Sequence, residues 1–417
     1  MALVAGAIAV TASAAQAAVP LCSGTTLTKS DGATLFTATP IYITGSSAVE
    51  PMLKILGAKL ASQATNPYVI IYLKDGSCSG VNRINTDGMI AAGTTMFYVP
   101  PDQDPTKASL TCTQTAAQLG DLVLADADAT LCPGISAQPA GTKDFQGPVN
   151  NMVMVVPAKS ALDGNTAISA EEAYLVFGLG TAGMVTPWND PTAYYIRTPD
   201  SGTRAMIAAN IGVGAHAWQG NDGTMGTING GTAFSSGTLY TAVKNATTDT
   251  TIGILGSDYL DQGTNRTAVK SLAFRAFGQH FAYWPDSTVS SYDKKNVREG
   301  RYAIWGYLHM LASVATGATV PTSAAGAYFV SLMQGTLASP QFNVNDAITD
   351  SHYVPQCAMK VTHDIEGGPL RGYTPPAPCG CYFETRATGT APASCTACTT
   401  DATCGTGKCR TGFCEAN

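Results

Sequence analysis

The residues best suited to chemistry in this sequence lie in one short segment, which begins with Arg197 and ends with Ser201, Gly202 and Thr203. The planar guanidinium of Arg197 can form paired hydrogen bonds to a tetrahedral oxyanion. The hydroxyl groups of Ser201 and Thr203 are further donors, and Gly202 lets a ligand approach the backbone closely. Asp200 is expected to hold the guanidinium in place. This set of donors favours the binding of an anion.

A strand and a helix are expected to position these groups. Residues 193–196 predict a short strand, and residues 204–210 predict the first turns of a helix. The Ser-Gly-Thr run therefore lies where a helix begins, and the unpaired N–H groups and dipole of such an end favour anions. An ordinary helix cap beside a solvated arginine is the alternative interpretation, and the segment alone does not exclude it.

Two earlier segments predict the same order of strand, loop and helix. Residues 40–43 predict a strand, and the loop 44–48 that follows it reads Thr-Gly-Ser-Ser-Ala. Residues 68–73 predict a second strand, and Ser77 lies in the Gly/Ser loop after it. Both loops place backbone N–H groups at the beginning of a helix, which suits an anion, although such turns are also common without a ligand.

Together these segments resemble periplasmic phosphate-binding proteins, the receptors of ABC phosphate importers, over residues 38–335. The Glu-Glu-Ala-Tyr helix and Trp-Asn-Asp turn within 168–190, and the strand 251–255, agree with that family. The resemblance implies an α/β fold of the type II periplasmic-binding-protein kind, with two lobes of mixed, mostly parallel sheet. The implied phosphate ligands are Ser46, Ser47, Ala48, Ser77, Asp126, Arg197, Ser201, Gly202 and Thr203, with Asp200 supporting Arg197.

The resemblance gives one acidic residue a particular role, which is to accept a proton from bound phosphate. The strand within 120–128 places Asp126 in this role and leaves Asp128 as the alternative. Sulfate carries no proton near neutral pH, so its oxygen would face a buried carboxylate without a hydrogen bond. Asp126 is therefore expected to be the element that selects phosphate.

The expected organisation of the chain follows the same resemblance. Residues 85–118 are expected to be an insertion, and residues 300–310 predict a strand and a helix. The expected parts are a signal peptide at 1–17, a first lobe at 38–148 and 286–372, a second lobe at 149–285, and a Cys-rich tail at 373–417.

The composition agrees with an exported protein that does not bind nucleic acid. Charged residues are 12% of the 417, the net charge is −6, and no run of Lys and Arg occurs. Residues 2–17 are apolar and end in Ala-Gln-Ala, which predicts a signal peptide. No later segment has the length and apolar character of a membrane span. Acidity does not exclude anion binding, because neutral donors and one arginine can hold a dehydrated anion.

The twelve cysteines predict disulfides, because an exported chain with an even number of cysteines commonly pairs them. Eight of them lie in the last 61 residues, which marks this tail as a separate module that depends on cross-links. A zinc site is the alternative, but the tail has one Cys-x2-Cys pair and no second pair or histidine at finger spacing. The pairing itself stays open.

Enzyme signatures are incomplete. The run 178–183 satisfies a dinucleotide-binding pattern, but a predicted helix precedes it and Pro187 follows, whereas the pattern requires a strand and then a helix. No Gly-x-Ser-x-Gly motif occurs, and the five histidines lie beside no nucleophile motif. A triad that forms only in space would leave no such signature.

The implied function is that of an extracytoplasmic solute-binding protein, periplasmic or at the cell surface. It would capture inorganic phosphate, or a similar tetrahedral oxyanion, between its lobes for ABC-type uptake. An ABC permease would be its protein partner, and no catalysis, cofactor or metal is expected of what would be a monomer. The alternative is a secreted or cell-surface protein that uses the scaffold for adhesion or another ligand, which the Cys-rich tail and the insertion favour.

Overall fold

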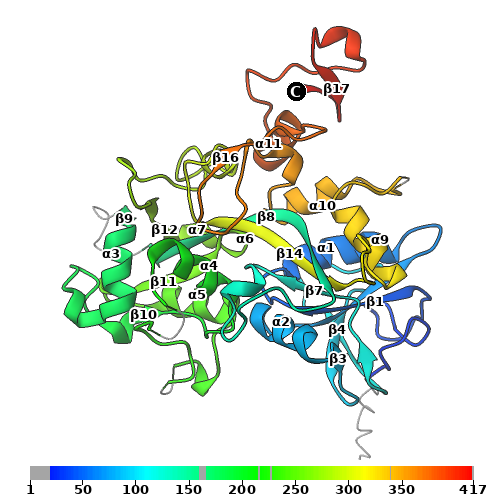
Figure 1. Cartoon of the computed structure of the whole chain (residues 1–417), viewed down its shortest axis with the longest axis horizontal. Helices are drawn as coiled ribbons and strands as arrows, with labels where there is room; N and C mark the ends of the chain where they lie inside the picture. Colours follow the sequence, from blue (N-terminus) through cyan, green and yellow to red (C-terminus); the bar gives the residue numbers. More distant parts are fainter. Residues whose placement is uncertain (1–18, 159–165, 215–216, 226–227, 339, 416–417) are drawn as a thin grey trace, which may run out of the picture.

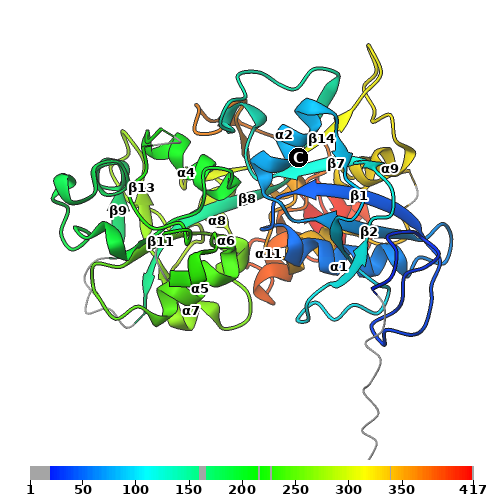
Figure 2. The same cartoon turned by 90° about the horizontal axis from the view of Figure 1, so that it is seen from below.

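The computed structural model describes residues 19–158, 166–214, 217–225, 228–338 and 340–415. The predicted signal peptide lies outside these residues. The described chain is a mixed α/β protein with two halves, and the long strand β8 (Thr142–Pro157) runs from one half into the other (Figures 1 and 2). Among the described residues, none of the helices has the length and apolar character needed to cross a lipid bilayer.

One ten-stranded sheet runs through both halves of the described chain. β1 pairs in parallel with β2 and β7, whereas β8 and β14 are antiparallel to their neighbours. β12 (Val269–Ser271) pairs with β8 beside the main path. In order across the sheet, the strands are β10 (Tyr194–Tyr195), β11 (Ile252–Gly256), β8, β14 (Trp305–Ser313), β7 (Leu122–Ala125), β1 (Thr39–Gly45), β2 (Tyr68–Leu73), β4 (Thr95–Tyr98) and β5 (Leu110–Thr113).

The sheet is mixed, as expected, with more antiparallel pairing than the expected mostly parallel arrangement. Parallel pairs in the main sheet of the described chain are β1–β2, β1–β7 and β10–β11. The additional antiparallel pairs come from the crossing strands β8 and β14 and from β4 and β5. The smaller paired strands are β3 (Met89–Ile90) with β6 (Gln118–Leu119), β9 (Ala167–Ser169) with β13 (Ala273–Arg275), β15 (Val361–Thr362) with β16 (Arg371–Gly372), and β17 (Lys408–Arg410) with β18 (Phe413–Glu415).

Two large hydrophobic cores correspond to the two halves. In the β1 half, side chains such as Leu56 and Phe329 pack beneath β1 and β2. In the β11 half, side chains such as Met154 and Leu239 pack around β8 and β11. The expected lobe boundaries stay predictions. The helices are α1 (Glu50–Ala61), α2 (Ser77–Thr86), α3 (Ala170–Tyr174), α4 (Gly202–Ile211), α5 (Ser236–Asn245), α6 (Ser257–Leu260), α7 (Asn265–Ala268), α8 (Lys295–Arg298), α9 (Ala324–Met333), α10 (Val344–Asp350) and α11 (Gly380–Thr388).

The segment 300–310 differs from its prediction, because it contains no helix. β14 begins at Trp305 and continues to Ser313 as a strand. It pairs with β7 on one side and with β8 on the other, and its residues from Trp305 to Ala312 are buried. A continuous apolar run of this kind fits a central strand as well as a helix, and the pairing on both edges decides for the strand.

The predicted insertion 85–118 forms short strands that extend the sheet. Within it, β4 pairs with the edge of β2 and β5 pairs with β4. A disulfide between Cys22 and Cys112 joins β5 to the residues that precede β1. The insertion is therefore a structured edge of the β1 half.

All twelve cysteines form disulfides, which confirms the prediction from their number, and none is free among the described residues. The zinc alternative therefore has no free thiol there. The pairs are Cys22–Cys112, Cys78–Cys132, Cys357–Cys379, Cys381–Cys395, Cys398–Cys409 and Cys404–Cys414.

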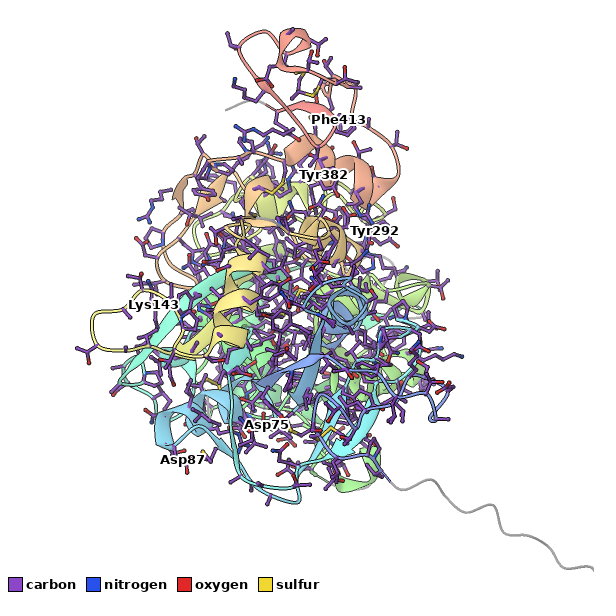
Figure 3. The ribbon with its side chains drawn as sticks, turned by 90° about the vertical axis from the view of Figure 1, so that its right-hand side faces the viewer. Asp75, Asp87, Lys143, Tyr292, Tyr382 and Phe413 are labelled. Carbon is purple, nitrogen blue, oxygen red and sulfur yellow. A yellow bond between two sulfur atoms is a disulfide. The ribbon has the colours of Figure 1, made fainter. Side chains whose placement is uncertain are left out.

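The tail projects from the body of the molecule beyond α11 (Figures 1 and 3). Its terminal hairpin, β17 and β18, is attached to α11 by Glu415, whose carboxylate accepts hydrogen bonds from the amides of Cys381 and Tyr382 at 3.2 and 3.0 Å. Three disulfides close loops of 10 to 14 residues within this part. Cross-links replace a hydrophobic core in so short a segment.

Candidate functional site

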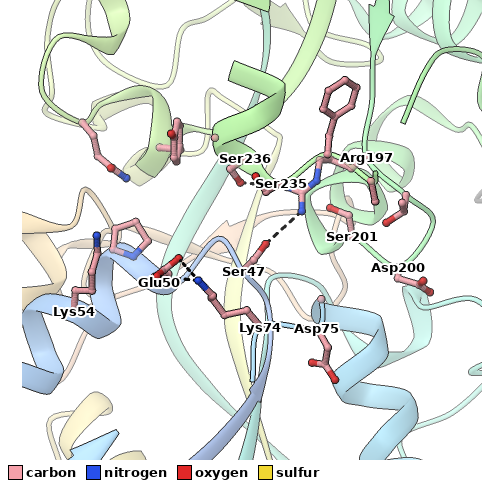
Figure 4. A pocket seen from close by; sticks show the side chains of 18 of the residues that line it. Ser47, Glu50, Lys54, Lys74, Asp75, Arg197, Asp200, Ser201, Ser235 and Ser236 are labelled. Carbon is pink, nitrogen blue, oxygen red and sulfur yellow. Dashed lines mark hydrogen bonds and ion pairs between the residues drawn. The ribbon is translucent and has the colours of Figure 1, made fainter. Parts of the chain in front are cut away.

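A cleft of about 760 Å³ opens between the two halves of the molecule (Figure 4). Several of the segments predicted from sequence contribute to its walls, including the beginning of α1, the loop before α2 and the loop before α4. The beginning of α5 and part of α6 complete the opposite wall. The lining residues are Ser47, Glu50, Pro51, Lys54, Lys74, Asp75, Gly76, Pro105, Thr106, Arg197, Thr198, Asp200, Ser201, Ala233, Phe234, Ser235, Ser236, Gly237, Tyr259 and Gln262.

The beginning of α4 is packed directly against the β1 half. A methyl group added to Gly202 would come within 2.5 Å of the Ser77 hydroxyl and 2.9 Å of the Asp126 Cβ. The amide of Cys78 donates a hydrogen bond to the carbonyl of Asp200 at 3.0 Å. Glycine is therefore required at position 202 for close packing, and the first turns of α2 and α4 meet at the inner end of the cleft.

Arg197 lies at this inner end and is 7% exposed. Its Nη1 donates to the Ser236 hydroxyl at 3.2 Å, and its Nη2 donates to the Ser47 hydroxyl at 3.4 Å, from the opposite wall (Figure 4). Its Nε is buried and has no hydrogen-bond partner among the described residues. Burial lowers the pKa of Arg197 to about 10, although the charges of Asp126 and Asp258 oppose this change. A buried guanidinium of this kind favours a bound anion.

Asp126, the predicted acidic residue of the site, is 2% exposed and follows β7 directly. One carboxylate oxygen, Oδ2, accepts hydrogen bonds from the hydroxyls of Ser46 and, at 3.3 Å, Ser77. The other oxygen, Oδ1, is buried and has no partner among the described residues. Burial raises the pKa of Asp126, while the Ser46 hydroxyl and the charge of Arg197 act in the opposite direction. Oδ1 is thus a free acceptor.

The structure places the remaining predicted residues in two groups. Ser47 and Ser201 line the cleft, whereas Thr203 does not, and its hydroxyl is buried in the first turn of α4 without a partner among the described residues. Ser46 and Ala48 are engaged within the protein, because the Ser46 hydroxyl donates to Asp126 and accepts from the Ala48 amide at 3.1 Å. These two residues shape the loop rather than offer free donors in this state.

The structure does not show Asp200 in contact with Arg197, and it places Asp128 in a helix cap. Among the described residues, no hydrogen bond or ion pair joins the carboxylate of Asp200 to Arg197, although Asp200 lines the cleft. The carboxylate of Asp128 accepts from the amide and hydroxyl of Thr130 and so caps a short helical turn. Asp126 therefore fits the acidic role better than Asp128, and the supporting role of Asp200 stays a prediction.

Sequence reasoning missed a second buried carboxylate, Asp258, at the beginning of α6. It is 0% exposed, its Oδ1 accepts from the Asn150 amide at 3.1 Å, and its Oδ2 has no partner among the described residues. Burial raises its pKa to about 7 and outweighs the Asn150 hydrogen bond, which lowers it. The available signal was a further strand–Gly-Ser–helix unit, in which β11 ends at Gly256 and α6 begins at Ser257.

Glu50 does not leave an unpaired negative charge in the cleft. Its carboxylate forms an ion pair with the Lys74 ammonium at 3.0 Å (Figure 4). The same ammonium lies 3.5 Å from the centre of the Phe97 ring. The charge that would repel an anion is therefore compensated within the β1 half.

The comparisons with known proteins give similarity in structure only. No protein-family model matches the sequence, and the comparison with curated proteins finds no match. Among solved structures, a putative phosphate ABC transporter substrate-binding protein from Clostridium perfringens is 14% identical, with coverage of 76% of this chain and 99% of that one and a TM-score of 0.48. An ABC-type phosphate transport receptor from Vibrio cholerae is 15% identical, with coverage of 75% and 99% and a TM-score of 0.45. A possible phosphate-binding protein from Planctomyces limnophilus is 12% identical, with coverage of 76% and 93% and a TM-score of 0.42.

Proposed function

We propose that this protein is an extracytoplasmic solute-binding protein that captures inorganic phosphate at the inner end of the cleft. The observation that carries the proposal is a set of buried polar atoms that have no partner among the described residues. They are Oδ1 of Asp126, Nε of Arg197 and the hydroxyl of Thr203. A buried polar atom without a hydrogen bond costs about 1–3 kcal/mol, so a ligand that satisfies several of them gains affinity.

The chemistry of these atoms matches a protonated oxyanion. The Arg197 Nε is a donor, the Thr203 hydroxyl can donate, and the Asp126 Oδ1 can only accept while it is ionised. The backbone N–H groups at the beginning of α4 add the positive end of a helix dipole. Inorganic phosphate near neutral pH offers oxygens to the donors and one P–OH to the carboxylate. Sulfate has no such proton, so Asp126 disfavours it.

The proposal includes a location outside the cytoplasm and a transport partner. Six disulfides fit an oxidising compartment, where such bonds persist. The two halves, which β8 and β14 connect, would act as the lobes 38–148 with 286–372 and 149–285, and they would close on the anion. The closed shape is what an ABC permease would recognise. The proposed role needs no catalytic group.

Calorimetric titration tests the proposal. The oxidised protein, residues 18–417, is freed of bound anion and titrated with phosphate and with sulfate at neutral pH. One-to-one binding of phosphate without a signal from sulfate is the expected result. Absence of a signal from phosphate would overturn the proposal.

The projecting tail favours a second candidate, a cell-surface protein that retains the scaffold for adhesion. Three disulfides stabilise the part of the tail beyond Gly380, and the hairpin at its end projects from the body of the molecule in Figure 1. Silence of both anions in the titration, together with retained folding, would make this candidate the better one.

A further inference from the structure

The cleft is much larger than a tetrahedral oxyanion requires. Its volume of about 760 Å³ lies in the range of pockets that bury ligands of drug-like size, about 300–1,000 Å³. The cleft keeps this volume although the two halves touch at its inner end. There the Cys78 amide donates a hydrogen bond to the Asp200 carbonyl, and the Arg197 guanidinium donates one to the Ser47 hydroxyl. The space therefore extends outward from a site whose inner end is already assembled.

The outer part of the cleft has a polar lining from both halves. Lys54 lies on the far side of Glu50 from Arg197 in Figure 4, and its ammonium donates to the carbonyl of Lys107 at 3.1 Å. Burial lowers the pKa of Lys54. On the opposite wall, Tyr259 carries a phenol, and Gln262 donates its amide to the carbonyl of Asp258 at 3.2 Å. An ammonium has three donors, so Lys54 keeps donors for a ligand, as Gln262 keeps its carbonyl oxygen.

The charges of the lining restrict what the outer part can hold. The cleft has three cationic side chains and three carboxylates among its lining residues, and one of these carboxylates, Asp75, is paired with Arg83, which lies outside the lining. Arg197 is the cation at the inner end, and Lys74 is already paired with Glu50. A second phosphoryl group in the outer part would therefore meet a single ammonium, that of Lys54, which has no ion pair among the described residues, and no guanidinium. The neutral hydroxyl groups of a ligand can both donate and accept hydrogen bonds, so they suit the Lys54 ammonium and the Gln262 carbonyl oxygen.

We infer that the cleft binds a hydroxylated organic phosphate monoester, such as a sugar phosphate, with its phosphoryl group at Arg197 and its hydroxyl groups between Lys54 and Gln262. This inference rests on the proposed function, because it uses the same anion site. At about pH 6, near the second pKa of such groups, the monoester retains one P–OH, from which Asp126 can accept a hydrogen bond. The polyhydroxylated part fills the space that inorganic phosphate leaves open.

Titrations at about pH 6 with inorganic phosphate, glycerol 3-phosphate, glucose 6-phosphate and glucose test the inference. The expected result is that one of the monoesters binds at least about tenfold more tightly than inorganic phosphate, while glucose gives no signal. Binding of inorganic phosphate without competition from either monoester would overturn the inference and leave the proposed function intact. Absence of binding by inorganic phosphate and by both monoesters would overturn the inference and the proposed function.

A variant of the outer wall separates the two ligands. Lys54→Met is expected to weaken binding of the preferred monoester by about tenfold, because it removes a charged donor, and to change phosphate affinity less than about twofold. Lys59→Met, on the same helix and outside the cleft, is the matched control. Gln262→Leu tests the opposite wall if the first variant does not fold. Equal changes for the two ligands, including no change, would overturn the inference.

Discussion

Two buried groups of charged side chains in this molecule have similar components and different hydrogen bonding. In the β11 half, Lys294, Arg266, Asp261 and Asp286 form a closed network in which both cations contact both carboxylates. At the inner end of the cleft, Arg197 has no ion pair among the described residues. Asp126 does not line the cleft, but its charge acts on Arg197, and one of its carboxylate oxygens is buried without a partner among the described residues. The first group is complete without a ligand, and the second is not.

This difference separates a structural role from a binding role. A buried ion cluster whose atoms are all bonded has little to gain from a ligand. A cluster with unpartnered donors and acceptors gains those hydrogen bonds when a complementary ligand binds. Both groups are buried, so burial does not distinguish them. The presence of unpartnered donors and acceptors does.

The largest effect is expected from breaking the closed network. Lys294→Met removes the cation that contacts Asp261 and, at 3.2 Å, Asp286, and it leaves two buried carboxylates with one remaining cation. Loss of one partner from a buried pair costs about 3–5 kcal/mol of unfolding free energy. Denaturant unfolding measures this loss, and Lys295→Met, at the exposed neighbouring position, is the control. A loss equal to that of the control would contradict the structural role.

Asp258 predicts a pH dependence of stability. Burial raises its pKa to about 7, whereas an unfolded aspartate titrates near pH 4. The folded state therefore holds this proton more tightly, so the contribution is fully present below about pH 4 and is lost as the pH rises to about 7. Asp258→Asn is expected to remove this part of the pH dependence, on the order of 2–4 kcal/mol across that interval.

Unfolding curves of the wild type and the variant, measured from pH 4 to pH 7 without ligand, provide this comparison. Asp87→Asn, at an exposed position, is the matched control and is expected to leave the difference from wild type constant with pH. Parallel pH profiles for wild type and Asp258→Asn would contradict the burial effect.

Removal of Arg197 is expected to affect binding rather than folding, unlike removal of Lys294. Arg197→Met should weaken phosphate binding by at least about 2 kcal/mol, since it removes a charge-assisted donor from a buried site. The unfolding free energy without ligand should change little or increase, because the substitution relieves a buried charge. Calorimetry and denaturant unfolding separate the two quantities. Arg301→Met, an exposed control, should alter neither.

The sequence predicted the loops that surround Arg197, but it did not predict the side chains that other helices add to them. Gly-Ser or Ser-Gly-Thr runs between strands and helices gave Ser47, Ser77 and Gly202, because local turn chemistry is written in short segments. The sequence did not predict Ser236 and Asp258, because only the packing of α5 and α6 brings them to Arg197. Long-range packing has no local signature of this kind.

The fold was predicted to a similar extent. The mixed α/β class and the presence of disulfides followed from patterning and cysteine number, whereas the cysteine partners depend on which segments the fold brings together. The missing helix in 300–310 has the same cause, since pairing on both edges of β14 decided between two readings of one apolar run.

The most direct test of the unpartnered atoms is calorimetric titration of wild type and Asp126→Asn with phosphate and sulfate at neutral pH. The wild type is expected to bind phosphate and reject sulfate. The variant replaces the acceptor-only carboxylate with an amide that can donate, so its preference for phosphate should fall by at least about tenfold. A preference that is unchanged in the variant would contradict the role of Asp126 and, with it, the claim that the open hydrogen bonds at the inner end of the cleft select the ligand.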